Sequence, residues 1–212
     1  MNRIEKITEI SRKHFVNAKG SHRWDHTQRV LKLAEQIARQ EGADVEVVKI
    51  AALLHDIGRV KEDQSNGTID HALVGAEMAE KILKELSLEE ELIKKIVHCI
   101  KTHRFRGSHI PETIEAKVLF DADKIDSIGA VGIGRAFLFA GEVGAKLHDQ
   151  HIDVEKTKPY TEDDTAYREY LVKLSTIKDR VLTGGGRLLA EDRHQFMVEF
   201  FDRLNKEVDG AL

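Results

Sequence analysis

The chain has 212 residues, of which 41% are hydrophobic and 33% are charged, and its formal net charge at pH 7 is −4. This length fits one domain with a sizeable core, and the negative net charge excludes an overall basic field of the kind that binds nucleic acid. The one cysteine, Cys99, excludes an internal disulfide framework and favours a reducing cytoplasm. The first residues include acids and no long apolar stretch, so we expect neither a signal peptide nor a membrane anchor.

Apolar residues recur at helical spacing through nearly the whole chain, and only two prolines are present to interrupt them. The expected helices cover residues 4 to about 20, 24–41, 44–58, 71–86, 87–103, 115–140, 167–182 and 187–207. No segment shows convincing strand alternation, an internal repeat or a low-complexity tract. The sequence therefore predicts an all-α bundle.

Several helix ends in the first half carry specific signals. Asp44 is a good N-cap for the third expected helix, and Gly58 is a suitable terminator for it. The polar residues 61–70 predict a loop that contains an Asn-Gly turn. Ser87–Glu90 has the residue types of a capping box, which predicts the start of the next helix.

The second half is richer in glycine. The four glycines from Gly129 to Gly141 each weaken a helix by about 1 kcal/mol relative to alanine, so they predict either a break between two helices within residues 115–140 or close packing. The polar residues 144–165 predict a loop or flap, and Gly184–Gly186 predicts a flexible hinge. The last helix either packs back on the bundle or forms a homodimer interface, with Phe196, Phe200 and Phe201 as its large apolar residues.

A pair of polar residues, His55 and Asp56, directly follows the apolar run Ile50–Leu54. Burying them without partners would cost roughly 1–3 kcal/mol for each group, and a divalent metal ion bound by imidazole and carboxylate would compensate. His26 and Asp123 are candidates for two further ligands. This mixed set suits Mn²⁺, Fe²⁺, Ni²⁺, Co²⁺ or Zn²⁺ better than Ca²⁺, leaves Mg²⁺ open, and frees positions for water and a phosphate oxygen.

Three short motifs carry a resemblance to a known family. Residues 24–30 (WDHTQRV), 51–58 (AALLHDIG) and 121–126 (DADKID) resemble the H…HD…D motifs of the HD superfamily of metal-dependent phosphohydrolases. The similarity covers about residues 20–140, and we expect residues 1–212 to form a single HD-type domain with about 141–212 as a helical extension. The resemblance implies a helical bundle, hydrolysis of a phosphoester or phosphoanhydride, and one or two divalent ions. The implied metal ligands are His26, His55, Asp56 and Asp123.

The whole-chain pattern, including residues 98–105 and 193–197, resembles a narrower group within that superfamily. These are small bacterial HD hydrolases, some of which cleave nucleoside triphosphates to monophosphate and pyrophosphate. The resemblance therefore implies a small nucleotide as the substrate.

The last ligand is chosen between Asp121 and Asp123, because both cannot face one metal from a regular helix. The Asp-Lys-Ile sequence that follows the family's last aspartate favours Asp123. Asp126 lies one helical turn further on, and we expect it to orient a ligand or a water.

Other polar residues near these motifs are candidates for further roles. His71, His98 and His103 either help to hold a second metal ion or serve as a helix cap and as phosphate-binding or solvent-facing residues. The candidates for substrate binding, as charge-assisted donors, are Lys124, Arg59, His103 and Arg104. The candidates for catalysis are Asp56, His71 and Glu62, with His71 as a proton shuttle and Glu62 as a group that positions the attacking water.

The reaction that these residues predict is attack of water on phosphorus, with the metal lowering the pKa of its bound water and neutralising phosphoryl charge. Neither a nucleophilic serine or cysteine motif nor a Walker loop is present. We expect a cytoplasmic enzyme that acts on (deoxy)nucleoside triphosphates and engages neither nucleic acid nor a membrane. The alternatives are a 5′-nucleotidase or phosphodiesterase, and a non-catalytic binding module that the metal stabilises.

Overall fold

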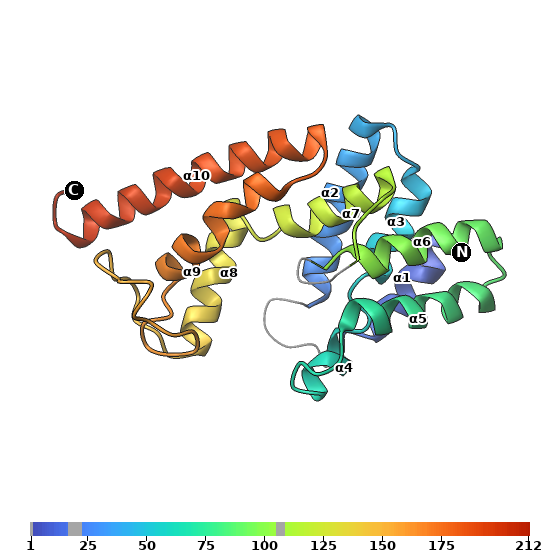
Figure 1. Ribbon diagram of the computed structural model, residues 1–212, viewed down its shortest axis with the longest axis horizontal. Coiled ribbons are helices and arrows are strands. Elements are labelled where there is room, and N and C mark those ends of the chain that lie inside the picture. The colour runs from blue at the N-terminus through green and yellow to red at the C-terminus, as the bar shows by residue number, and fades with distance from the viewer. Residues whose placement is uncertain (1, 17–22, 105–108) are drawn as a thin grey trace. The chain divides into compact units, whose positions relative to one another are not determined.

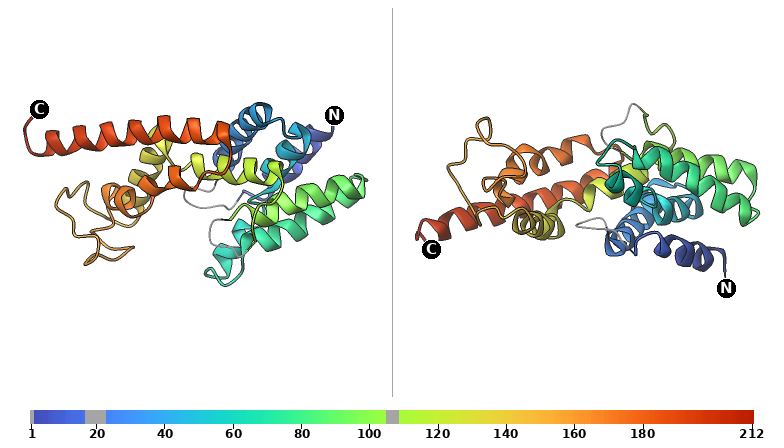
Figure 2. Two further views of the ribbon diagram at one scale, coloured as in Figure 1. Left: turned by 45° about the horizontal axis from the view of Figure 1, so that its top comes forward. Right: turned by 90° about the horizontal axis from the view of Figure 1, so that it is seen from below.

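The structure is a computed structural model, and it describes residues 2–16, 23–104 and 109–212. Within these ranges the chain forms helices and loops and no strand, which confirms the predicted all-α fold (Figures 1 and 2). No helix in the described ranges is both long and apolar enough to span a membrane. The chain divides into two compact units, Met1–Asp123 with Leu182–Gly186 and Lys124–Val181 with Arg187–Leu212. That both act as one domain stays a prediction.

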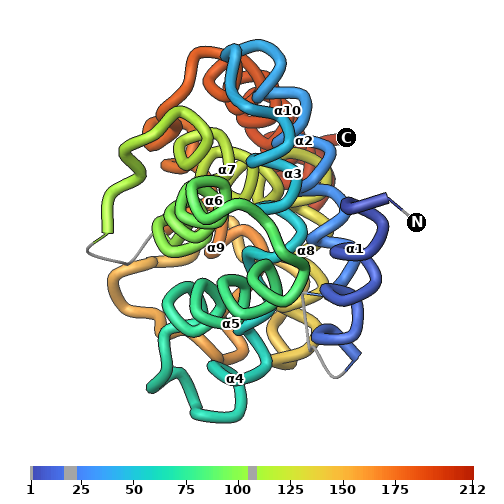
Figure 3. The backbone as a smooth tube through the Cα atoms, turned by 90° about the vertical axis from the view of Figure 1, so that its right-hand side faces the viewer, coloured from blue at the N-terminus to red at the C-terminus, as the bar shows by residue number. Residues whose placement is uncertain are grey.

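The first unit is built around α3 (Val45–Leu54), which packs against α1, α2 and α6 (Figure 3). The apolar residues Val47, Val48 and Ile50–Leu54 of α3 are all buried, and each large aliphatic side chain contributes roughly 1.5–3 kcal/mol. The other helices that lie wholly in the first unit are α1 (Arg3–Lys13), α2 (Trp24–Glu41), α4 (Arg59–Gln64), α5 (His71–Glu85) and α6 (Glu90–Thr102). Because Ile50–Leu54, the last five residues of α3, are all apolar and buried, the residues that follow them are delivered into the interior.

The second unit contains α8 (Gly129–Glu142), α9 (Ala166–Val172) and the 3₁₀ helix η1 (Leu174–Arg180). Two further helices, α7 (Ile114–Ile125) and α10 (Gly184–Val208), begin in the first unit and end in the second. Phe201 of α10 is 1% exposed and stacks on Tyr170, with ring centroids 4.6 Å apart. Phe196 is 46% exposed, and a homodimer that covers it stays a prediction. The predicted loop over residues 144–165 is confirmed, since no helix forms there.

Helix ends are predicted correctly where a local cap determines them. Gly42 ends α2 in the left-handed conformation (φ 68°), and the Asp44 side chain accepts hydrogen bonds from the backbone of Glu46 and Val47. A break does separate α7 from α8 within residues 115–140, but it lies at residues 126–128, and the glycines from Gly129 to Gly141 are inside α8. Gly132 instead packs closely, since a Cβ atom there would lie 2.2 Å from the backbone oxygen of Ser127.

The loop predicted at residues 61–70 is wrong in its first part, because α4 covers Arg59–Gln64. Gly58 does not simply terminate α3 but is the N-cap of α4. A Cβ atom at Gly58 would lie 2.4 Å from the backbone oxygen of His71, so this glycine allows α4 and α5 to approach closely. The polar composition concealed the helix, since its stabilising contact is an ion pair between Arg59 and Glu62.

The capping box predicted at Ser87–Glu90 is also wrong. Ser87 has φ 55°, and the backbone N–H of Leu88 donates to the carbonyl of Leu83, so Ser87 ends α5 in a Schellman-type turn. Glu89 is the N-cap of α6 and makes no side-chain capping bond. The serine serves the end of one helix rather than the start of the next.

The hinge predicted at Gly184–Gly186 is wrong, because these glycines form the first turn of α10. The Thr183 hydroxyl accepts from the backbone N–H of Gly186, and Gly185 donates to Glu41. A Cβ atom at Gly185 would lie 2.3 Å from Oε1 of Gln40, so the missing side chain permits this contact. The helix predicted over 167–182 is also broken, at Lys173 (φ −142°, ψ −56°), into α9 and η1.

Cys99 is fully buried in α6, and burial raises the pKa of its thiol to about 12. At pH 8 the thiolate fraction falls by about 10³-fold for a rise of three pKa units. We expect 5,5′-dithiobis(2-nitrobenzoate) to leave the native protein unmodified while it modifies the guanidinium-unfolded chain within minutes. Rapid modification of the native protein would contradict the buried placement.

Candidate metal centre

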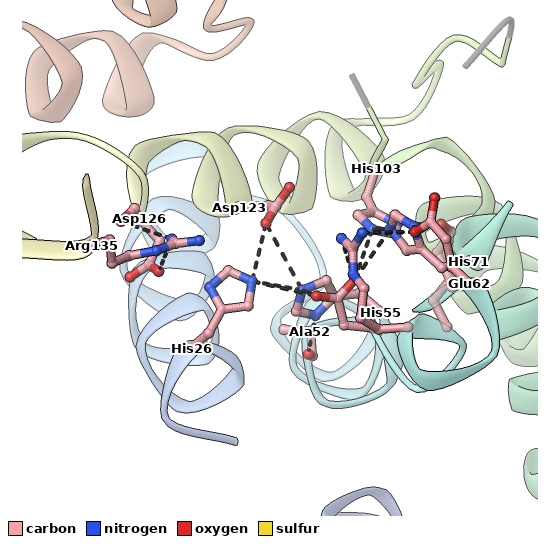
Figure 4. A network of polar contacts seen from close by, with 12 residues as sticks. His26, Ala52, His55, Glu62, His71, His103, Asp123, Asp126 and Arg135 are labelled. Carbon is pink, nitrogen blue, oxygen red and sulfur yellow. Dashed lines mark hydrogen bonds and ion pairs between the residues drawn. The ribbon is translucent and has the colours of Figure 1, made fainter. Parts of the chain in front are cut away.

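Four residues from three helical segments converge in the first unit (Figure 4). His26 lies in the first turn of α2, His55 and Asp56 follow α3 directly, and Asp123 lies in the last turns of α7. His26, His55 and Asp56 are 1%, 0% and 2% exposed, and the side chain of Asp123 is 15% exposed. We call these four residues the first cluster.

The polar atoms of the first cluster face one another. Nε2 of His26 lies 3.3 Å from Nε2 of His55 and 3.3 Å from Oδ1 of Asp123. Oδ2 of Asp56 lies 3.7 Å from the same atom of each imidazole. Two ligands bound to one ion at about 2.1 Å lie roughly 3.0–3.4 Å apart in octahedral or tetrahedral geometry, so this spacing is close to that of a coordination shell.

The protonation of His55 suits a ligand. Its Nδ1 donates a hydrogen bond to the carbonyl of Ala52 at 2.8 Å, and burial lowers its pKa to about 4. The neutral ring therefore carries its proton on Nδ1, which leaves the lone pair of Nε2 directed at His26 and the carboxylates. This donor set fits a divalent transition-metal ion.

The other oxygen of Asp56 faces a second cluster, which we define as Asp56, His71 and His103. Oδ1 of Asp56 lies 3.3 Å from Nε2 of His71 and 3.6 Å from Nε2 of His103, and these two nitrogens are 3.2 Å apart. Nδ1 of His103 donates to the carbonyl of Ile100 at 2.6 Å, and Nδ1 of His71 donates to Glu62 at 2.5 Å. Burial lowers the pKa of His71 to about 2, so its ring is neutral. Three acceptor atoms thus point at one place, which suits a cation.

Charged residues lie beside the second cluster. Glu62 is 7% exposed and accepts from Arg59 at 2.8 Å, and its other oxygen pairs with Arg104 at 2.8 Å. Arg59 also lies 3.4 Å from Oδ1 of Asp56, and Arg104 lies 3.1 Å from Asp70. The two guanidinium side chains are 18% and 23% exposed, so each keeps some access to solvent.

The remaining predicted site residues lie elsewhere or belong to the second unit. Asp121 is buried and accepts from the backbone of Leu182 and from both the N–H and the hydroxyl of Thr183, which accounts for its absence from the first cluster. Nε2 of His98 accepts from the backbone of Glu112 and takes part in neither cluster.

Two predicted residues belong to the second unit. Asp126 is buried and accepts from Arg135 at 2.8 Å, and the carbonyl of Lys124 accepts from Ser127. The roles of Lys124 and Asp126 towards substrate and ligands stay predictions. Sequence reasoning missed Asp70, Thr183 and Arg135 as partners, and only Asp70 carries a local signal, as the N-cap of α5.

Comparisons with known proteins bear on the same residues. The HD domain family model matches residues 23–128 of the chain. The YpgQ protein of Bacillus subtilis is 33% identical over 214 residues, which cover 99% of this chain and 96% of YpgQ. The chain belongs to the HD family.

Solved structures agree with this HD-family assignment. The crystal structure of Bacillus subtilis YpgQ in complex with ADP matches with a TM-score of 0.77 and 32% identity, over 98% of this chain and 99% of that one. An HD-superfamily hydrolase from Bacillus thuringiensis matches with a TM-score of 0.77 and 29% identity, over 97% and 96% of the two chains. Ribonuclease Y of Chloroflexus aurantiacus is 33% identical over 119 residues, which are 56% of this chain but 21% of that protein.

As a member of the HD family with hydrolases as structural neighbours, the chain is an enzyme, and the predicted family resemblance is confirmed. Its clustered histidines and aspartates fit the divalent metal that an HD domain uses. The HD pair is delivered to the cluster because the last five residues of α3, Ile50–Leu54, are all buried and the helix ends at Leu54.

Proposed function

We propose that this HD-family enzyme hydrolyses (deoxy)nucleoside triphosphates to monophosphate and pyrophosphate. The convergence of His26, His55, Asp56 and Asp123 carries the proposal, since it assembles two imidazoles and two carboxylates around one position. YpgQ, which is similar over its whole length and was crystallised with ADP, supports a nucleotide with more than one phosphate. The net charge of −4 favours a small nucleotide over nucleic acid, and the single, reduced Cys99 favours the cytoplasm.

The first cluster would hold one divalent ion, drawn from Mn²⁺, Fe²⁺, Ni²⁺, Co²⁺, Zn²⁺ and Mg²⁺. Such an ion supplies Lewis acidity towards phosphoryl oxygens and activation of water. We propose that Asp56, His71 and His103 hold a second ion, because Asp56 directs one oxygen into each cluster and Nε2 of both His71 and His103 faces the second of these oxygens.

Three cationic residues, Arg59, Arg104 and Lys124, are proposed to bind phosphate oxygens. Arg59 keeps Nε, a buried donor with no hydrogen-bond partner among the described residues, and leaving such a donor unpaired costs roughly 1–3 kcal/mol. A phosphate oxygen would satisfy it. Arg104 has the same charge and is partly exposed, and Lys124 follows Asp123 directly in the chain.

Product analysis by phosphorus NMR tests the proposal. Protein stripped of metal and reconstituted with Mn²⁺ is incubated with a mixture of dNTPs and, separately, with nucleoside monophosphates. We expect pyrophosphate and monophosphate from the dNTPs, and at least about 10³-fold slower release in Asp56→Ala, because metal ligation supplies several kcal/mol of transition-state stabilisation. Orthophosphate from the monophosphates alone would instead indicate a 5′-nucleotidase.

A phosphodiesterase is the second candidate, and the similarity to ribonuclease Y favours it. This similarity covers 119 residues, which make up 21% of ribonuclease Y. Hydrolysis of bis(p-nitrophenyl) phosphate or a dinucleotide, without release of pyrophosphate from dNTPs, would replace the first proposal with this one.

A further inference from the structure

Glu62 joins three segments of the first unit through one buried carboxylate. It accepts from Arg59 within α4, from His71 at the start of α5, and from Arg104 just beyond α6, at 2.8, 2.5 and 2.8 Å. Figure 4 shows Glu62 beside His71, on the side of that ring away from Asp123. The two guanidinium groups donate to the Glu62 carboxylate, and the carboxylate oxygen that faces His71 accepts from Nδ1 of that ring.

This contact decides where His71 carries its proton. A neutral imidazole has one N–H, and the Glu62 carboxylate requires that N–H at Nδ1. Nε2 of His71 is then left with a lone pair, and it faces Oδ1 of Asp56 at 3.3 Å and Nε2 of His103 at 3.2 Å. The tautomer of His71 therefore controls whether the second cluster can accept a cation.

The imidazoles of the two clusters differ in what sets their tautomer. The tautomer of His55 is set by the backbone carbonyl of Ala52, and that of His103 by the backbone carbonyl of Ile100. For His71 it is the side chain of Glu62. Substitution can therefore release His71 without moving the backbone.

We propose that Glu62 is a positioning residue of the second cluster, which holds the proton of His71 on Nδ1 and so makes Nε2 a ligand nitrogen. This role differs from the positioning of the attacking water expected from the sequence. It rests on the second ion of the proposed function, and it follows the general arrangement in which a carboxylate orients a metal-binding histidine.

The first test measures the tautomer in metal-free protein, without any dependence on activity. Long-range ¹H–¹⁵N correlation spectra of protein labelled at histidine distinguish Nδ1–H from Nε2–H, and loss of one signal set in His71→Gln assigns the residue. We expect the Nδ1–H form in the wild type, and a fall of this form to about half or less in Glu62→Gln, whose amide can donate to Nδ1. An Nε2–H tautomer in the wild type would overturn the proposal even if the variant does not fold.

The second test counts and titrates Mn²⁺ by electron paramagnetic resonance. We expect two ions in the wild type, and in Glu62→Gln a first ion bound as before and a second bound roughly 10–100-fold more weakly. Asp63→Asn, which removes an exposed carboxylate from the same helix, should change neither ion and is the matched control. Binding of only one ion by the wild type would refute the second metal site. The NMR measurement of the His71 tautomer would then still decide whether Glu62 holds the proton of His71 on Nδ1. Two ions with unchanged affinities in Glu62→Gln would refute the positioning role.

Discussion

Asp56→Asn should lower kcat/KM by about 10³-fold or more and weaken metal binding at both clusters, because one carboxylate directs an oxygen into each. His26→Ala should weaken mainly the first ion, since Nε2 of His26 faces His55, Asp56 and Asp123 of the first cluster. Isothermal titration calorimetry with Mn²⁺, together with steady-state kinetics, distinguishes weaker binding at both clusters from weaker binding at the first cluster alone.

The asparagine is nearly isosteric with the aspartate, so Asp56→Asn tests charge and ligation with little change in packing. Asp63→Asn supplies the matched control, with the same chemical change at an exposed position. If Asp56→Asn bound two ions with wild-type affinity, Asp56 would not be a shared ligand. Equal loss in both asparagine variants would point to a general electrostatic effect.

Gly58→Ala should destabilise the protein by about 3 kcal/mol, which corresponds to a fall in Tm of roughly 6–12 °C. The added Cβ would lie 2.4 Å from the carbonyl oxygen of His71 and 2.8 Å from the backbone nitrogen of Gly75, so backbone has to move. Since the displaced segment carries His71, we also expect weaker binding of the second ion. Calorimetry and Mn²⁺ titration on the same samples measure both effects.

Gly134→Ala is the control for this substitution. Gly134 lies within α8, and a Cβ atom there would meet nothing within 4 Å. Alanine favours the helix by about 1 kcal/mol over glycine, so Gly134→Ala should be neutral or slightly stabilising. A Gly58→Ala protein as stable as Gly134→Ala would show that α4 and α5 can separate without cost.

The sequence predicts the fold class and the position of the HD pair because the signals for both are local. Helical spacing and the cap at Asp44 define α3, and the position of the HD pair after an apolar helix requires a compensating partner. His26 and Asp123 follow from the family motifs rather than from geometry. Spacing alone does not bring three helical segments to one point.

What the sequence could not predict depends on partners distant in the chain. Ser87 has the residue type of an N-cap, yet its left-handed backbone ends the preceding helix. Gly184–Gly186 has the composition of a hinge, but Asp121, Glu41 and Thr183 supply the hydrogen bonds that fix it as a helix start. The pairing of Glu62 with Arg104 likewise joins residues that no local pattern connects.

The attachment of Leu182–Gly186 to Asp121 makes the first unit discontinuous along the chain. Two helices, α7 and α10, run from one unit into the other, so no flexible linker marks a place to cut. A fragment that stopped at Asp123 would lack Leu182 and Thr183, which donate hydrogen bonds to the buried carboxylate of Asp121. Asp121 would then be left without these donors, two residues before the candidate metal ligand Asp123. Insertions, deletions and fusions between residues 124 and 181 therefore have to return the chain to Asp121.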